Sequence, residues 1–117
     1  MSERKARIEQ VNDYWNRRMP YDPYEGDPRS LAQAVTRGGK CHDFVKAKAA
    51  GLTGAGFAEG DMQVGIGVTT DTSEPHSVLI VDGMVMDNRT SRTYSVEDAE
   101  KHGLMLTDRL AYGIFGK

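Results

Sequence analysis

Three side chains of the kinds that form nucleophilic triads occur in this chain in the order Cys41, His76 and Asp87. A thiolate can attack an acyl carbon, and an imidazole can take up the thiol proton and later protonate the leaving group. A carboxylate can hold that imidazole in the correct tautomer and orientation. The chemistry that these residue types predict is acyl transfer through a thioester, provided that the elements around them bring the three side chains together.

Cys41 lies in the sequence GGKC, where a helix is predicted from about Lys40 to Leu52. The N-terminus of a helix presents unpaired N–H groups and positive potential, which favour a thiolate and can face a developing oxyanion. Gly38 and Gly39 allow the backbone to turn sharply just before it. A lone cysteine is more often a buried structural thiol, but its place in GGKC favours the reactive interpretation.

His76 and Asp87 are predicted to lie on one β-hairpin. The segments 76–81 and 84–88 have the composition of strands, and Asp82-Gly83 between them is a strong signal for a two-residue turn. This turn sets Val78 opposite Asp87, so that His76 is a diagonal neighbour of Asp87 on the same face. A slip of one residue would move one of the two to the opposite face.

Each of these two residues also has a simpler interpretation. Asp87 could merely start a turn with Asn88, and His76 could be a loop residue that follows Pro75. Their common placement on one face of a hairpin favours a joint role.

Other candidate residues were weighed for the same chemistry. His42 is a rival base, but adjacent residues of a helix do not face each other. His102 lies in a polar segment, where we expect it to be solvated. The second oxyanion donor, beside the backbone N–H of Cys41, is predicted to be a side chain from upstream. Three amides are the candidates: Asn12, Asn16 and Gln33.

A zinc site is not expected. Cys41, His42, Asp43 and His76 are residue types that bind metals, but structural zinc sites show closely spaced Cys or His pairs at two places, and this chain has one.

The remaining pattern predicts helices first and strands afterwards. Apolar spacing predicts a helix over 2–18, and Ser30 can cap a short helix over 31–35. Four further elements are expected: a strand with one buried face over 62–69, the hairpin strands, a short helix over 95–102 with Ser95 and Asp98 spaced as a capping box, and a last strand over 109–115. This order predicts an α+β fold with an antiparallel sheet, and the absence of repeats or a linker predicts one domain, 1–117.

Composition excludes several classes of protein. The 117 residues are 38% hydrophobic and 27% charged with a net charge of -2, and the basic residues are scattered, so we expect no nucleic-acid partner. No run of about 18 apolar residues exists, which argues against a membrane span. A single cysteine excludes an internal disulfide. The charged N-terminus has no apolar signal-peptide core.

Five segments together resemble the bacterial transglutaminase-like cysteine peptidases, whose best-known branch comprises periplasmic proteases that clip large adhesins and so regulate biofilms. The segments are VNDYWN at 11–16, YDPY at 21–24, GGKCHDFVKAKAAGLTGAGF at 38–57, HSVLIVDG at 76–83 and VMDN at 85–88. The resemblance implies a papain/transglutaminase-like core and a protein or peptide substrate. It also implies that Cys41, His76 and Asp87 are the catalytic Cys, His and Asp.

The chain departs from the adhesin-clipping branch in three ways. That branch carries acidic residues around the cysteine that implicate calcium, whereas here Lys40 precedes Cys41 and only Asp43 remains, so we predict no calcium dependence and no cofactor. The missing signal peptide leaves two interpretations, the mature form of an exported protein or a cytoplasmic or virion-associated protein, and the start MSERKAR favours the second. The chain is short for this family, and the resemblance to its short members implies a phage-encoded protein, for which phage structural proteins are an alternative class of partner. The alternative function is a non-catalytic structural or binding module, such as a phage particle component.

Overall fold

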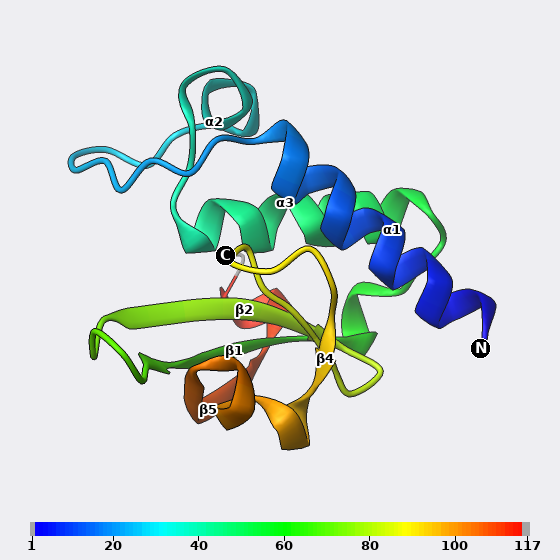
Figure 1. Ribbon diagram of the computed structural model, residues 1–117. Helices are drawn as coiled ribbons and strands as arrows, with labels where there is room; N and C mark the ends of the chain where they lie inside the picture. Colours follow the sequence, from blue (N-terminus) through cyan, green and yellow to red (C-terminus); the bar gives the residue numbers. More distant parts are fainter. Residues whose placement is uncertain (1, 116–117) are drawn as a thin grey trace.

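The computed structural model describes residues 2–115 and has three helices over one face of an antiparallel sheet (Figure 1). The helices are α1 (Glu3–Arg18), α2 (Leu31–Arg37) and α3 (Cys41–Gly54). The strands are β1 (Met62–Thr69), β2 (Pro75–Val81), β3 (Met84–Met86), β4 (Tyr94–Ser95) and β5 (Leu104–Ala111), in the sheet order β4-β3-β2-β1-β5. Helices therefore precede strands, and the predicted α+β class with an antiparallel sheet is confirmed.

Side-chain caps define the starts of the first two helices. The Ser2 hydroxyl accepts a hydrogen bond from the backbone N–H of Lys5 at the start of α1. Ser30 and Gln33 form a reciprocal capping box at α2. Such a box satisfies N–H groups that have no partner within the helix. The caps confirm the predicted starts, and α2 extends two residues beyond the predicted end.

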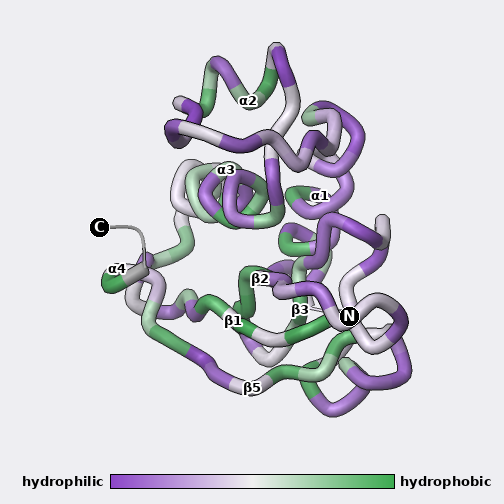
Figure 2. The backbone as a smooth tube through the Cα atoms, turned by 90° about the vertical axis from the view of Figure 1, so that its left-hand side faces the viewer, coloured by the Kyte–Doolittle hydropathy of each residue, from purple (hydrophilic) through white to green (hydrophobic). Residues whose placement is uncertain are grey.

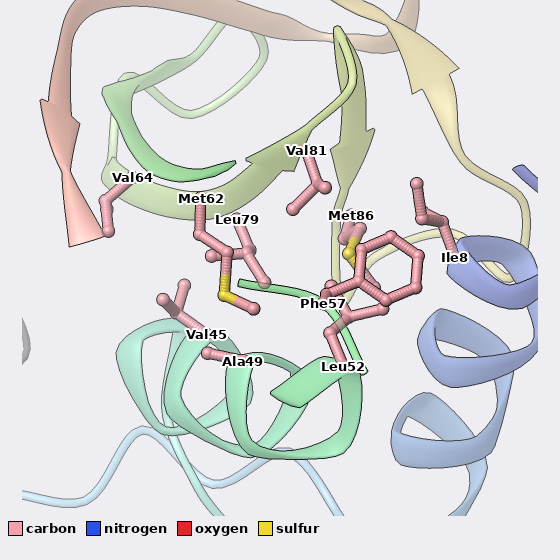
Figure 3. Packing of buried hydrophobic residues seen from close by; sticks show 10 residues of the cluster. All are labelled: Ile8, Val45, Ala49, Leu52, Phe57, Met62, Val64, Leu79, Val81 and Met86. Atoms are coloured by element: carbon pink, nitrogen blue, oxygen red, sulfur yellow. The ribbon is translucent and has the colours of Figure 1, made fainter. Parts of the chain in front are cut away.

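The main hydrophobic core lies between the helices and the sheet. In Figure 3, Val45, Ala49 and Leu52 of α3 point toward Met62 and Leu79 of the sheet. Ile8 brings α1 into the same core. Figure 2 shows the same arrangement from the side, with α3 above β1 and hydrophobic residues in both elements. Burial of this apolar stripe fixes where α3, and hence its N-terminus, sits over the sheet.

The β2–β3 hairpin has the predicted register. Val81 pairs with Met84 and Ile80 pairs with Val85. The turn residues Asp82 and Gly83 have φ angles of 54° and 73°, as the twist of a two-residue hairpin requires. The guanidinium of Arg4 pairs with the Asp82 carboxylate at 2.7 Å and so ties α1 to this turn.

The prediction that β1 has one buried face is wrong. A second cluster of buried side chains, which includes Val78, Ile80 and Leu104, packs on the face of the sheet away from α3. A Cβ atom on Gly65 would lie 2.8 Å from the Ile80 side chain. The glycines of β1 leave room for neighbouring side chains, and the segment 96–102 (orange in Figure 1) folds back beneath the sheet. The alternation of apolar and polar residues in one strand does not show whether another segment covers its second face.

Two predictions for the C-terminal part also need correction. Segment 95–102 forms two short 3-10 helices, η2 (Val96–Asp98) and η3 (Glu100–His102), and Ser95 makes no side-chain cap. The last strand starts earlier than predicted and ends at Ala111, where the short α4 (Tyr112–Phe115) follows. A further 3-10 turn, η1 (Glu59–Asp61), leads into β1. Within residues 2–115, no helix is long and apolar enough to cross a membrane.

Candidate active site

Cys41 is the first residue of α3, and the two glycines before it shape its approach. Gly38 has a φ angle of 104°, which favours glycine. A Cβ atom on Gly39 would lie 2.7 Å from the Sδ atom of Met19. The N–H of Gly39 also donates to the carbonyl of Pro20 in the preceding loop, at 2.9 Å. The predicted sharp turn into the helix is confirmed.

His76 and Asp87 meet as the hairpin register requires. The Nε2–H of His76 donates to Oδ1 of Asp87 at 2.9 Å. Both side chains are buried, with 8% and 0% of their surface exposed. The predicted common face of these two residues is confirmed. Because Nε2 is engaged, Nδ1 is the ring nitrogen left for the thiol.

Asp87 receives several other hydrogen bonds that sequence reasoning missed. The Tyr94 hydroxyl donates to Oδ2 at 2.7 Å, and the Arg89 guanidinium donates to the same oxygen at 2.7 Å. The backbone N–H of Arg89 donates to Oδ1 at 2.9 Å. This last contact is an Asx turn, so Asp87 starts a turn and also holds His76. In the sequence, the indication that Arg89 contacts Asp87 is its position two residues after Asp87.

Ser77 contacts the thiol directly and was not predicted. Its hydroxyl donates to Sγ of Cys41 at 3.2 Å. Ser77 follows His76 on β2, which packs against α3. Position beside the predicted histidine was the only signal available in the sequence, and it does not reveal which way the hydroxyl points.

The site favours a thiolate–imidazolium pair. Burial raises the pKa of the Cys41 thiol, but hydrogen bonds with His76 and Ser77 and the charge of His76 outweigh it, so this pKa is lowered. Burial lowers the pKa of His76, but interactions with Asp87 and Cys41 raise it to about 9. Burial also raises the pKa of Asp87, which hydrogen bonds from His76 and Arg89 bring well below its ordinary value.

A cavity of about 380 Å³ opens beside the thiol and the imidazole. Six of the residues that line it are Tyr21, Cys41, Asp71, Glu74, His76 and Arg89. Tyr21 is 58% exposed, and the loop between β1 and β2 supplies the two carboxylates. Cys41 and His76 therefore both face the same open cavity.

The other histidines and the three amide side chains considered in the sequence analysis make different contacts. His42 approaches Asp43 at 4.0 Å, and the exposed His102 stacks on the Tyr94 ring with centroids 4.2 Å apart. The three candidates for the second oxyanion donor have other partners. The Nδ2 groups of Asn12 and Asn16 donate to carbonyls of the 87–91 turn, and Gln33 caps α2. The packing of the helices sets the positions of these amides, and the spacing of residues in the sequence does not reveal that packing.

Comparison with solved structures finds strong likeness to LapG of Legionella pneumophila. The calcium-bound form matches with a TM-score of 0.76 over 93% of this chain and 66% of that one, at 20% identity. The fold is transglutaminase-like. Another LapG structure and an EGTA-treated one match with TM-scores of 0.75 at 19% identity, over 91% of this chain and 64% and 62% of theirs.

The likeness therefore concerns the fold, and this chain spans slightly less than two thirds of the LapG chains that it matches. Scans against protein-family models and against curated protein sequences find no match. The predicted papain/transglutaminase-like core, with Cys41 at a helix N-terminus, is confirmed.

The residues around Cys41 do not suit calcium. Calcium takes six to eight oxygen ligands, whereas Asp43 is the one nearby carboxylate on α3 and its Oδ2 already accepts from the Tyr24 hydroxyl and the Lys40 N–H, both at 2.9 Å. The charged groups of Arg29 and Lys40 lie over the ring of Tyr24, the residue that bonds Asp43, at 3.9 and 4.4 Å from the ring centroid. Among residues 2–115, no three His, Cys, Asp or Glu side chains gather in a way that could hold a metal.

Proposed function

We propose that this chain is a cysteine hydrolase, a peptidase or amidase, with Cys41 as nucleophile, His76 as base and acid, and Asp87 as the group that orients His76. The observation that carries the proposal is the buried His76, whose Nε2–H bonds Asp87 while its ring also interacts with the Cys41 thiol. The transglutaminase-like fold shared with LapG supports it, as does the sequence resemblance to cysteine peptidases.

The reaction would begin with transfer of the thiol proton from Cys41 to Nδ1 of His76. The thiolate then adds to the substrate carbonyl carbon, and the first-turn N–H groups of α3 stabilise the oxyanion. As the intermediate collapses, the C–N bond breaks and His76 returns its proton to the leaving amine, which yields a thioester and a free amine. Water deprotonated by His76 attacks the thioester, and the carboxylic acid and the thiol are released.

The proposed substrate is a protein or peptide. An open cavity beside Cys41, with an exposed aromatic ring and polar walls, suits an extended backbone better than a small enclosed ligand. A water nucleophile gives hydrolysis, and an amine in its place would give acyl transfer by the same groups.

Capture of the acyl-enzyme tests this function. The full chain is mixed with 4-nitrophenyl acetate and with short peptide amides, and the intact mass and the modified residue are determined by mass spectrometry. We expect a transient acyl group on Cys41 of the wild type, which is absent from Cys41→Ala and accumulates slowly in His76→Ala. Acylation of lysines alone, or none at all, would contradict the proposal and favour a non-catalytic binding module.

Three features of the setting remain predictions. Calcium independence is checked in the same assay, where acylation rates in calcium and in EGTA should agree. The cytoplasmic or virion-associated location and the phage-encoded origin rest on the sequence alone.

A further inference from the structure

Tyr21 lines the cavity beside the thiol and lies on a loop that is bonded to the residues just before Cys41. It pairs with Gly39 in an isolated parallel β-bridge. The Gly39 N–H donates to the Pro20 carbonyl at 2.9 Å, and the Asp22 N–H donates to the Gly39 carbonyl at 3.0 Å. Backbones paired in this way lie about 4.8 Å apart. Tyr21 is therefore held against the turn that leads into α3, on the same side of the cavity as the helix N-terminus.

The hydroxyl of Tyr21 is a donor without a partner. The hydroxyls of Tyr24 and Tyr94 donate to carboxylates at 2.9 and 2.7 Å. The Tyr21 hydroxyl, in contrast, makes no hydrogen bond to another residue within 2–115. Partial burial, together with the charges of Cys41 and Glu74 on the same cavity wall, raises the pKa of Tyr21. The hydroxyl therefore keeps its proton at neutral pH and is free to donate a hydrogen bond to a substrate.

The proposed reaction needs such a donor. Addition of the thiolate to a carbonyl carbon places negative charge on the carbonyl oxygen, and donors at about 2.7–3.1 Å from that oxygen stabilise the charge. The first-turn N–H groups of α3 supply donors on one side. The three amides considered for the second donor, Asn12, Asn16 and Gln33, bond other groups. A second donor is therefore required near the N-terminus of α3, where Tyr21 lies.

Other donors in the cavity wall are engaged or lie at its opposite end. The Arg89 guanidinium donates to Asp87 at 2.7 Å, and the Thr69 and Thr72 hydroxyls bond each other at 2.6 Å. Asn88 lines the cavity and directly follows Asp87, which bonds the imidazole nitrogen that faces away from the thiol. The amide of Asn88 is therefore a rival donor, but it comes from the carboxylate end of the triad.

We infer that Tyr21 is a catalytic residue of the proposed hydrolase, whose hydroxyl donates the second hydrogen bond to the oxyanion that forms when Cys41 adds to the substrate. The inference rests on the proposed function. The phenol keeps its proton throughout: its hydrogen bond strengthens as the carbonyl π bond opens, and weakens when the C–N bond breaks and the carbonyl re-forms. Such a bond favours the intermediate over the substrate, so it accelerates addition to a carbonyl without activating the thiol.

Two reactions of the same thiol test this role in the full chain. Acylation of Cys41 by 4-nitrophenyl acetate passes through an oxyanion, whereas alkylation by iodoacetamide displaces iodide from a saturated carbon and forms none. We expect Tyr21→Phe to slow acylation roughly 10- to 100-fold and to leave the rate of alkylation and its pH dependence unchanged. Tyr14→Phe, at an exposed tyrosine of α1, is the matched control and should change neither rate. Asn88→Ser tests the rival amide and should slow acylation less than Tyr21→Phe does.

Wild-type acylation in Tyr21→Phe would overturn the inference. Equal losses of acylation and alkylation would also overturn it, because they would show an effect on the thiol or on the fold. A greater loss of acylation in Asn88→Ser would assign the donor to Asn88 instead. A wild type that gains no acyl group on Cys41 would contradict the proposed function and this inference together, so the two failures are distinguishable.

Discussion

Asp87 is the residue on which the site's geometry depends most, because it joins β3 to the base, to the following turn and to β4. Its oxygens accept from His76, Arg89 and Tyr94 at 2.7–2.9 Å. Hydrogen bonds to a buried charge are worth about 1.5–3 kcal/mol each, so this carboxylate is held firmly. A fixed carboxylate fixes the imidazole, which in turn faces the thiol.

The first residue-scale prediction concerns Ser77. Its hydroxyl donates to Sγ of Cys41, and a hydrogen bond to a thiolate favours the charged form. Ser77→Ala should raise the pKa of the thiol by roughly 0.5–1 unit and slow iodoacetamide alkylation at neutral pH. Ser91→Ala, at an exposed serine, is the control. Equal pH profiles for the two variants would show that Ser77 does not stabilise the thiolate.

Residue identities in the site were only partly predictable from the sequence. Cys41, His76 and Asp87 could be brought together because a helix start and a two-residue hairpin turn have local signals. Tyr94 and Ser77 could not be predicted, because their roles depend on a later strand and on a side-chain direction. Asn12 and Asn16, with Gln33, were open candidates for the second oxyanion donor. The sequence does not show that α1 packs against the 87–91 turn and that this turn engages the two asparagines.

At the scale of elements, β1 pairs with β2, the strand that carries His76, and so fixes its position in the sheet. Gly67 of β1 pairs with His76 on one side and with Leu106 of β5 on the other. The prediction of the hairpin register succeeded because a two-residue turn dictates it. The second buried face of β1 was missed because its cover comes from residues about 30 positions later in the chain.

Gly67→Ala should disrupt this part of the sheet. A Cβ atom there would overlap the backbone carbonyl oxygen of Met105, so a strand must shift. We expect a loss of about 1–3 kcal/mol in the free energy of unfolding, measured by urea denaturation, together with slower alkylation of Cys41. Gly60→Ala, where a Cβ meets nothing within 4 Å, is the control. A similarly small effect in both variants would contradict the close strand contact.

The loop between β1 and β2 predicts a preference of the cavity for cations. Asp71 and Glu74 line the cavity, whereas the guanidinium of Arg89 is engaged by Asp87. At low salt, a cationic methanethiosulfonate should modify Cys41 faster than an anionic one. The ratio of the two rates should fall roughly two- to threefold in Glu74→Gln. Glu97→Gln, on η2, should leave the ratio unchanged, and a ratio unaffected by Glu74→Gln would refute the role of this loop.

At the scale of the whole molecule, helices over a sheet place a helix N-terminus beside a strand end, and this is the arrangement that joins Cys41 to His76. Sequence predicted the α+β class because apolar periodicity changes from helical to alternating along the chain. It could not predict Lys48 inside the core, because the helical pattern alone treats a lysine as a solvent-facing residue.

The burial of Lys48 makes stability depend on pH. Burial lowers the pKa of Lys48 to about 7 in the folded protein, whereas that of a lysine in water is 10.5. Between these values the unfolded chain binds more protons, so stability rises with pH, by at most about 1.4 kcal/mol per pH unit. Lys48→Met should therefore be more stable than the wild type at pH 7, and the difference should vanish above pH 10.5. Urea denaturation at several pH values measures this, and a difference independent of pH would contradict the account.

The most direct test of the central claim is the rate of Cys41 alkylation by iodoacetamide in the native protein as a function of pH, with His76→Ala and Asp87→Asn beside it. The lowered thiol pKa predicts that the rate rises at a pH below the value of about 8.5 for a free thiol. The rise should move to higher pH in both variants, and NMR spectra confirm that each is folded. A native thiol that stays inert, or one that titrates normally and ignores both substitutions, would contradict the catalytic role of Cys41, His76 and Asp87.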